Sequence, residues 1–183
     1  MKKILIIFFI NIFAINSAYS AEEVLTSLKE GGKIIFIRHA LAPGNGDPEN
    51  FDLNDCSTQR NLSKEGQRQA EYIGEFFRNN KVKIDEVLSS EWCRCKETAK
   101  IAFNNFSTNS FLNSFYSSKF AKNKDKQVKA LKEYIKKFKS DKNLVLVTHY
   151  VLISEILNYG PSSGEIVVSN RNLNIIGSLE INY

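Results

Sequence analysis

Two histidines and two arginines are the residues of this 183-residue chain best suited to chemistry on an anionic group. His39 and His149 are its only histidines, and each lies one residue beyond an apolar run. Arg38 precedes His39, and Arg94 lies a few residues after residues 86–88, which we expect to form a short strand. Ligands of open α/β sheets bind beyond the carboxyl ends of strands. We therefore expect these four side chains to meet in one pocket.

Such a pocket suits a tetrahedral dianion. A guanidinium group stays charged and can bind two phosphate oxygens through two parallel hydrogen bonds. Cationic neighbours lower the pKa of an imidazole, which keeps it neutral and nucleophilic. A site that only bound phosphate could consist of the arginines alone, whereas a neutral histidine among them indicates covalent phosphoryl transfer. This chemistry requires no metal and no other cofactor, and we expect none.

Alternating strands and helices position these residues. We expect strands at 33–37, 86–88, 144–147, 166–168 and 173–181, and helices at 22–30, 65–80, 94–103, 127–138 and directly after Tyr150. This order predicts an α/β sheet with helices on both faces. Residues 40–62 form a long loop of the kind that is usually functional in a compact domain.

The N-terminus has the pattern of a secretory signal peptide. Two lysines precede an apolar run from Ile4 to about Ile15, and the small residues Ala18 and Ser20 follow. We expect residues 1–20 to be removed after Ser20 and residues 21–183 to form one secreted or periplasmic domain. The alternative is an uncleaved membrane anchor, but the apolar run is shorter than the ~20 residues of a spanning helix. We therefore expect no stable membrane insertion after cleavage.

The three cysteines favour one disulfide in an oxidising compartment. Cys93 and Cys95 are too close in sequence to bridge each other easily, whereas Cys56 could pair with either. The sequence does not choose between these two partners. Zinc is not expected, because two histidines and no second cysteine pair with finger spacing supply too few ligands.

The charge of the chain does not indicate a nucleic-acid partner. It carries 25 Lys and Arg against 20 Asp and Glu, a net charge of +5. Many of the lysines fall between residues 119 and 142, where a solvated helix face is the simplest explanation. Nucleic-acid binding would require denser basic residues interleaved with aromatics.

Four blocks of the sequence resemble the histidine phosphatase superfamily, in the branch that includes phosphoglycerate mutase-like phosphatases. The blocks are IIFIRHA, RNLSKEGQRQA, VLSSEWCRCKETA and LVLVTHYVLI, in that order, within residues 31–157. The resemblance implies a three-layer α/β/α sandwich around a mostly parallel sheet. It also implies a phosphohistidine intermediate on His39, with Arg38, Arg94 and His149 holding the phosphoryl oxygens.

The resemblance adds two candidate phosphate-binding residues and one departure. Asn45 stands at the spacing where mutase-type relatives carry a phosphate-contacting Asn, and Arg60 is either a pocket residue or a surface arginine. The glycine that usually follows the Arg-His pair is Ala40 here, a small residue that we expect the turn to tolerate.

The general acid of many relatives has no counterpart at its usual place. Between Thr98 and Lys124 the chain contains no Asp or Glu. The candidates are Glu165, which we favour because it opens a strand near the expected pocket, Asp47 and Asp55 in the long loop, and water. The segment rich in phenylalanine between residues 103 and 120 could roof the pocket, but we favour a packing role.

These features predict an exported phosphomonoesterase acting on a small-molecule phosphate ester. A phosphoprotein phosphatase is one alternative, and a catalytically weak module of the same fold that binds a phosphate ligand is another. We rank mutase activity lower, because an exported protein has no evident pool of phosphoglycerates.

Overall fold

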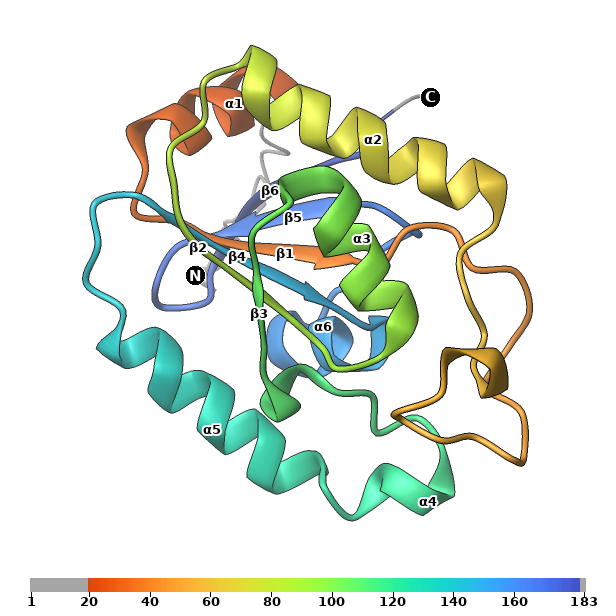
Figure 1. Ribbon diagram of the computed structural model, residues 1–183. Helices are drawn as coiled ribbons and strands as arrows, with labels where there is room; N and C mark the ends of the chain where they lie inside the picture. The colour runs from red at the N-terminus through yellow and green to blue at the C-terminus, as the bar shows by residue number, and fades with distance from the viewer. Residues whose placement is uncertain (1–19, 182–183) are drawn as a thin grey trace, which may run out of the picture.

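A computed structural model describes residues 20–181 of the protein (Figure 1). In this part of the chain, strands form a six-stranded sheet in the order β3-β2-β4-β1-β5-β6. The β1–β4, β2–β4 and β2–β3 pairs are parallel, and the β1–β5 and β5–β6 pairs are antiparallel. The strands are β1 Ile34–Arg38, β2 Ile84–Ser89, β3 Ser107–Thr108, β4 Asn143–Thr148, β5 Ile166–Ser169 and β6 Ile175–Leu179.

Helices cover both faces of the sheet because successive strand residues point to opposite sides. Ile35 and Ile37 belong to one core with residues of α1, α2 and α3, while Ile34 and Phe36 belong to a second core with residues of α5 and α6. The helices are α1 Ala21–Glu30, α2 Lys64–Asn79, α3 Cys93–Phe103, α4 Ser118–Ala121, α5 Lys124–Lys137 and α6 Tyr150–Leu157. The predicted three-layer α/β/α sandwich is confirmed (Figure 1).

The two C-terminal strands refine the prediction of a mostly parallel sheet. Both pair antiparallel, so the sheet is mixed, with its parallel part around β1, β4 and β2. The strand expected at 173–181 begins later, at Ile175. Leu173 has a φ of 64° and its amide donates to Asn170, so this residue belongs to the turn between the two strands.

The segment from 104 to 120 contains elements that the sequence did not predict. It holds the short edge strand β3, the 3-10 turn Ser110–Leu112 and the start of α4. Each is only two to four residues long, too short for a hydrophobic period to develop. Its asparagines and serines form caps, as where Asn109 accepts from the amide of Phe111.

Residues 1–19 of the predicted signal peptide lie outside the described part of the chain. Ser20, its last residue, is the N-cap of α1, where its hydroxyl accepts from the Glu23 amide and the Glu23 carboxylate accepts from the Ser20 amide. Within residues 20–181, no helix combines the length and apolar character needed to cross a bilayer.

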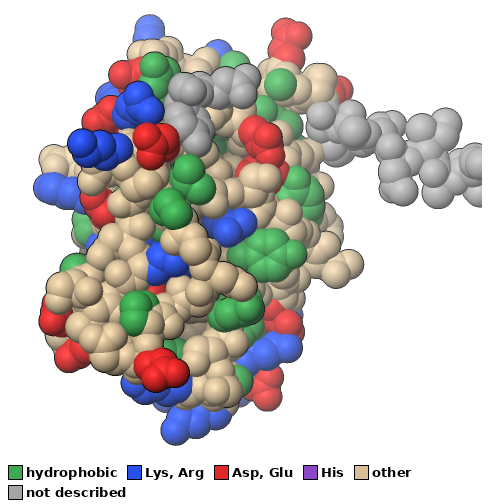
Figure 2. Space-filling view, turned by 90° about the vertical axis from the view of Figure 1, so that its right-hand side faces the viewer, with side chains coloured by type: hydrophobic (Ala, Val, Ile, Leu, Met, Phe, Trp, Pro, Cys, Tyr) green, Lys and Arg blue, Asp and Glu red, His purple; other side chains and the backbone are tan. Residues whose placement is uncertain are grey.

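The parallel strands bring the candidate residues to one edge of the sheet. Arg38 of β1 is paired with Thr148 of β4, and Ser89 of β2 is paired with Val147. The residues that directly follow these strands, His39, Ser90 and His149, therefore start from adjacent points. The right-hand side of Figure 1, where β1 and β4 end, faces the viewer in Figure 2.

Candidate active site

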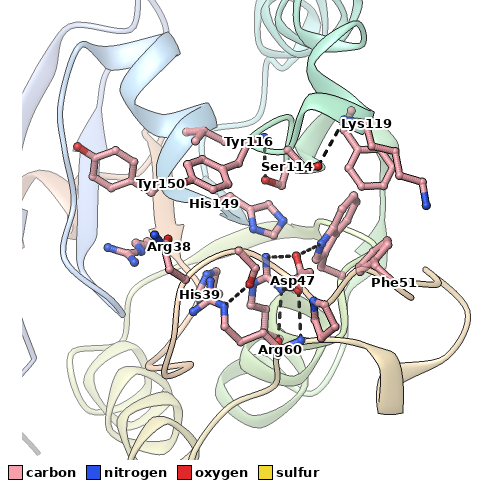
Figure 3. Close-up of a pocket in the computed structure, with 18 of the residues that line it drawn as sticks. Arg38, His39, Asp47, Phe51, Arg60, Ser114, Tyr116, Lys119, His149 and Tyr150 are labelled. Atoms are coloured by element: carbon pink, nitrogen blue, oxygen red, sulfur yellow. Dashed lines mark hydrogen bonds and ion pairs between the residues drawn. The ribbon is translucent and has the colours of Figure 1, made fainter.

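A cavity of about 310 Å³ lies at this edge of the sheet (Figure 3). Its lining includes both histidines and both candidate arginines: Arg38, His39, Arg94 and His149. Arg38 and His39 follow from β1, Arg94 lies in the first turn of α3, and His149 precedes α6. On the face seen in Figure 2, Lys and Arg side chains lie near the middle with hydrophobic side chains around them. The expected gathering of two arginines and two histidines is therefore present in the structure.

His39 is buried and held in one orientation. Its Nδ1 lies 2.8 Å from the carbonyl oxygen of Ala40. Because a carbonyl can only accept, Nδ1 carries the proton and Nε2 has a free lone pair. Burial lowers the pKa of His39 well below its usual range, and the charge of Arg94 lowers it further. The imidazole is neutral and is suited to act as a nucleophile.

The turn after His39 accepts alanine where relatives have glycine. Ala40 is not among the residues with positive φ, and its buried amide donates to Thr98 Oγ1 at 3.0 Å. The next residue, Leu41, packs closely on α2, where a Cβ on Gly66 would lie 2.0 Å from the Leu41 carbonyl oxygen. Gly66 thus lets the helix approach the backbone beside the candidate nucleophile.

His149 is held in place by Ser90, the residue that directly follows β2. Its Nε2 lies 2.8 Å from Ser90 Oγ, and its ring is 5.6 Å from that of His39 between centroids. Burial lowers the pKa of His149 well below its usual range, again with a contribution from Arg94. Cys95 packs against the same ring, and burial raises the pKa of its thiol to about 12. His149 is therefore a neutral, oriented group.

Both arginines have a buried Nε without a hydrogen-bond partner among the described residues. Arg38 Nη1 donates to the carbonyl oxygen of Pro161 at 2.9 Å, and its guanidinium lies 5.5 Å from the centre of the Tyr150 ring. A buried donor without an acceptor costs about 1 to 3 kcal/mol. An oxyanion that reached these nitrogens would relieve that cost.

The two added phosphate-site candidates both line the cavity. Arg60 is half-buried, and its side chain donates to the carbonyl oxygens of Ala42 and Gly46, so the guanidinium also holds the loop in shape. Asn45 is exposed at the cavity edge. The structure thus excludes the interpretation of Arg60 as a surface arginine remote from the pocket.

Among the candidate acids, Asp47 lines the cavity and Glu165 and Asp55 do not. The buried carboxylate of Glu165 accepts from the Tyr159 hydroxyl at 2.5 Å and from the Ser162 amide at 2.7 Å. The expectation that Glu165 faces the pocket is wrong, because these two bonds turn the carboxylate into the loop before β5. Asp55 is exposed and caps a 3-10 turn.

One disulfide joins the long loop to the helix that carries Arg94. It links Cys56 to Cys93, and Cys95 is free and buried. Gln59 reinforces the same connection, because its side-chain oxygen accepts from the Cys93 amide at 2.9 Å and its side-chain nitrogen donates to the Asp52 carbonyl oxygen at the same distance. The predicted bridge from Cys56 is present, and its partner is the cysteine next to Arg94.

We expect replacement of both bridged cysteines by serine to lower the free energy of unfolding by about 2 to 5 kcal/mol. Denaturant unfolding of the double variant measures the loss. Reductant serves as the matched control, since it should destabilise the native protein by a similar amount and leave the double variant unchanged. Equal stability of native and double-variant protein without reductant would show that the bridge does not support the loop.

An aromatic wall lies beside the arginines, and the sequence did not predict its members Phe51 and Trp92 as part of the site. Phe51, Trp92 and Phe120 lie with ring centroids 5.1 to 5.6 Å apart, and all three line the cavity. Tyr116 and Tyr150 stand at the cavity edge with 59% and 47% of their surface exposed. The phenylalanine-rich segment therefore has the favoured packing role at Phe111, which is in the core, and the less favoured pocket role at Phe120, which lines the site.

Comparison with known proteins agrees with this site. The sequence profile of the histidine phosphatase superfamily (branch 1) matches residues 34–113. A curated relative, serine/threonine-protein phosphatase Pgam5, mitochondrial, of Drosophila virilis, is 34% identical over 76 residues, which are 42% of this chain and 24% of that protein. The match thus spans about a quarter of the relative's length.

Solved structures show the same fold at low sequence identity. The protein histidine phosphatase SixA complexed with tungstate has a TM-score of 0.55 and 14% identity, over 80% of this chain and 96% of that one. Phosphoglycerate mutase from Thermus thermophilus has a TM-score of 0.57 and 15% identity, over 82% and 99% of the two chains. The class is therefore that of α/β proteins with the phosphoglycerate mutase-like fold. Within it, residues 34–113 are similar to the histidine phosphatase superfamily, branch 1.

Proposed function

We propose that the protein is an exported phosphomonoesterase that works through a phosphohistidine intermediate on His39. The observation that carries this proposal is the state of His39, a buried neutral imidazole whose Nδ1 donates to the Ala40 carbonyl oxygen while Nε2 is left unprotonated. A protein that only bound phosphate would not need a nucleophile oriented in this way. Arg38 and Arg94 line the same cavity and supply the charge that a phosphoryl group requires.

In the first half of the reaction, His39 Nε2 attacks phosphorus in line and the bond to the leaving oxygen breaks. The arginines and His149 bind the equatorial oxygens, whose charge they are placed to stabilise before the reaction begins. In the second half, water attacks phosphorus and the phosphorus–nitrogen bond breaks. Inorganic phosphate leaves, and His39 returns to its neutral form.

The substrate is a small-molecule phosphate ester. A cavity of about 310 Å³ is at the small end of ligand pockets, so it accommodates a phosphoryl group and a compact leaving group. The aromatic wall and the two edge tyrosines provide apolar contact for that leaving group. Phosphoprotein hydrolysis is the second candidate, because the curated relative is named a serine/threonine-protein phosphatase.

Release of inorganic phosphate from a panel of phosphomonoesters and phosphopeptides tests this function. We expect turnover of small monoesters by residues 21–183, with little turnover of phosphopeptides. Preference for phosphopeptides would support the second candidate. Tungstate binding with no turnover of any substrate would instead identify a phosphate-binding module and would contradict the proposed enzyme.

Export is a separate part of the proposal, supported by the lysines, apolar run and small residues of 1–20. N-terminal sequencing of protein from the envelope fraction should find Ala21 as the first residue. Removal of Ser20 deletes the α1 capping box, which typically costs about 0.5 to 2 kcal/mol, so the processed form should be less stable than one that retains Ser20. An intact Met1 in cytosolic protein would contradict export.

A further inference from the structure

The carboxylate of Asp47 occupies the guanidinium that a phosphoryl group would use. Its Oδ1 accepts from Arg94 Nη1 at 2.6 Å, and its Oδ2 accepts from Arg94 Nη2 at 3.1 Å. Trp92 Nε1 donates to Oδ2 at 3.1 Å, and the Arg60 amide donates to Oδ1 at 3.2 Å. Figure 3 shows Asp47 inside the pocket, with dashed lines at its carboxylate. Asp47 thus holds both terminal nitrogens of Arg94 in the two-point geometry that suits phosphate.

A phosphoryl group that binds both terminal nitrogens of this guanidinium displaces the carboxylate, which leaves only Nε free. Arg94 Nη1 already donates to Asp47 and to the Arg60 carbonyl oxygen, and Nη2 donates to Asp47. The side chain of Arg94 is 4% exposed and that of Asp47 is 17% exposed, so neither charge is well hydrated. Once the phosphoryl group has replaced it on Arg94, the Asp47 carboxylate has lost its cation and lies beside a dianion. The loss of the positive charge and the approach of the negative charge both favour the protonated form of Asp47.

The position of Asp47 is notable because carboxylates are scarce around the cavity. Among the described residues that line it, only Asp47 and Glu49 carry one. Glu49 is exposed, Glu165 is turned away, and the usual position after the second arginine has no acid. Asp47 is therefore the carboxylate that is both inside the pocket and coupled to the group that binds phosphate.

We propose that Asp47 is the general acid of the reaction and that binding of the phosphoryl group to Arg94 activates it. This inference rests on the proposed phosphatase function. It assigns the proton donor that the sequence could not place, and it makes the donor competent only when substrate occupies the site. In the empty site the same carboxylate keeps Arg94 oriented.

The proton balance of the cycle is complete. The substrate binds as the monoanion, and its proton moves to Asp47 as the phosphoryl oxygens replace the carboxylate on Arg94. His39 attacks, the bond from phosphorus to the leaving oxygen breaks, and Asp47 gives its proton to that oxygen. The carboxylate then takes a proton from the water that attacks the phosphohistidine. Phosphate departs, and that proton leaves with the product as Asp47 returns to Arg94.

The electrostatic surroundings of Asp47 are mostly cationic. Burial acts to raise its pKa, but the hydrogen bonds and charge of Arg94 hold the pKa below its usual range while the pair is intact. The charged or titratable side chains that line the cavity with it are Arg38, His39, Glu49, Arg60, Arg94, Lys119 and His149, together with the phenols of Tyr116 and Tyr150. Arg94 is the one that makes two bonds to the carboxylate, so its release is the step that changes the acidity of Asp47.

Leaving-group dependence tests the assignment. An alkyl phosphate needs a proton on its departing alkoxide, whereas p-nitrophenolate leaves without one. Asp47→Asn should slow an alkyl or sugar phosphate by about 10² to 10⁴ while changing p-nitrophenyl phosphate by less than about 10-fold. Equal loss on both substrates would overturn the assignment and leave Asp47 with a positioning role only.

Two carboxylates serve as matched controls. Asp55→Asn changes an exposed residue of the same loop outside the cavity. It should not slow the alkyl phosphate more than p-nitrophenyl phosphate. Glu49→Gln removes the other carboxylate of the cavity lining. Selective loss on alkyl phosphate in Glu49→Gln, with none in Asp47→Asn, would assign the donor to Glu49 and overturn our proposal.

Proton uptake on anion binding provides a readout that does not require turnover. Calorimetric titration with tungstate in buffers of different ionisation enthalpy counts the protons that accompany binding. The native protein should take up about one proton more than Asp47→Asn, since the histidine contributions are common to both. Equal uptake would contradict the exchange on Arg94. A difference in uptake in a protein without phosphatase turnover would instead support the exchange and refute the proposed function.

Discussion

His39→Ala is expected to lower the turnover of phosphate monoesters by several orders of magnitude. The substitution removes the nucleophile, and no other described residue of the cavity presents a buried neutral imidazole whose partner leaves Nε2 free. Steady-state kinetics on p-nitrophenyl phosphate measures the loss, because this substrate makes the smallest demand on the general acid.

His149→Ala is the matched control, because it replaces the only other histidine of the chain. It should reduce the rate through poorer stabilisation of the oxygens but keep His39 able to form the intermediate. Thermal unfolding of both variants establishes that they fold. Full activity in folded His39→Ala would mean that the nucleophile is another residue.

Arg94→Ala should weaken transition-state stabilisation by about 2 to 4 kcal/mol, or roughly 30- to 1,000-fold in kcat/KM. The side chain is 4% exposed and provides two terminal donors inside the cavity. Arg94→Lys keeps the charge but loses the planar fork, so its rate should fall between those of the native protein and Arg94→Ala. Kinetics on one monoester ranks the three proteins.

Loss of folding must be separated from loss of catalysis in this series, because Arg94→Ala leaves the Asp47 carboxylate without its ion pair. The double variant Arg94→Ala with Asp47→Asn removes both charges and should recover stability without recovering activity. An exposed arginine of α2, Arg68, provides the surface control, and its replacement by alanine should leave the rate unchanged. Native activity in folded Arg94→Ala would remove this residue from the phosphate site.

Much of the fold could be predicted because the sheet centre leaves a strong signal in the sequence. The residues of β4 are buried throughout, which requires the continuous apolar run that identified the strand. The positions of His39 and His149 after parallel strands then implied that they meet. The short β3 and α4 left no comparable signal, and the turn at Leu173 depends on a positive φ that its residue type does not indicate.

The disulfide partner, the Asp47–Arg94 ion pair and the orientation of Glu165 could not be predicted, because they depend on the direction of side chains and on loop conformation. Cys93 and Cys95 lie two residues apart on a helix, so they point in nearly opposite directions. Cys93 faces the long loop and bridges Cys56, while Cys95 faces His149. The pairing of Asp47 with Arg94 likewise joins residues 47 positions apart through the conformation of a loop. The prediction that Glu165 faces the pocket was wrong because its carboxylate accepts hydrogen bonds from the Tyr159 hydroxyl and the Ser162 amide.

The site of phosphorylation during turnover tests most directly whether His39 is the nucleophile. Residues 21–183 would be mixed with a labelled monoester, quenched within milliseconds without acid, digested and mapped by mass spectrometry. We expect an acid-labile, base-stable phosphoryl group on the peptide that contains His39, present in the native protein and in His149→Ala and absent in His39→Ala. Turnover with no phosphoryl group on His39, or with a base-labile group on another residue, would contradict this expectation.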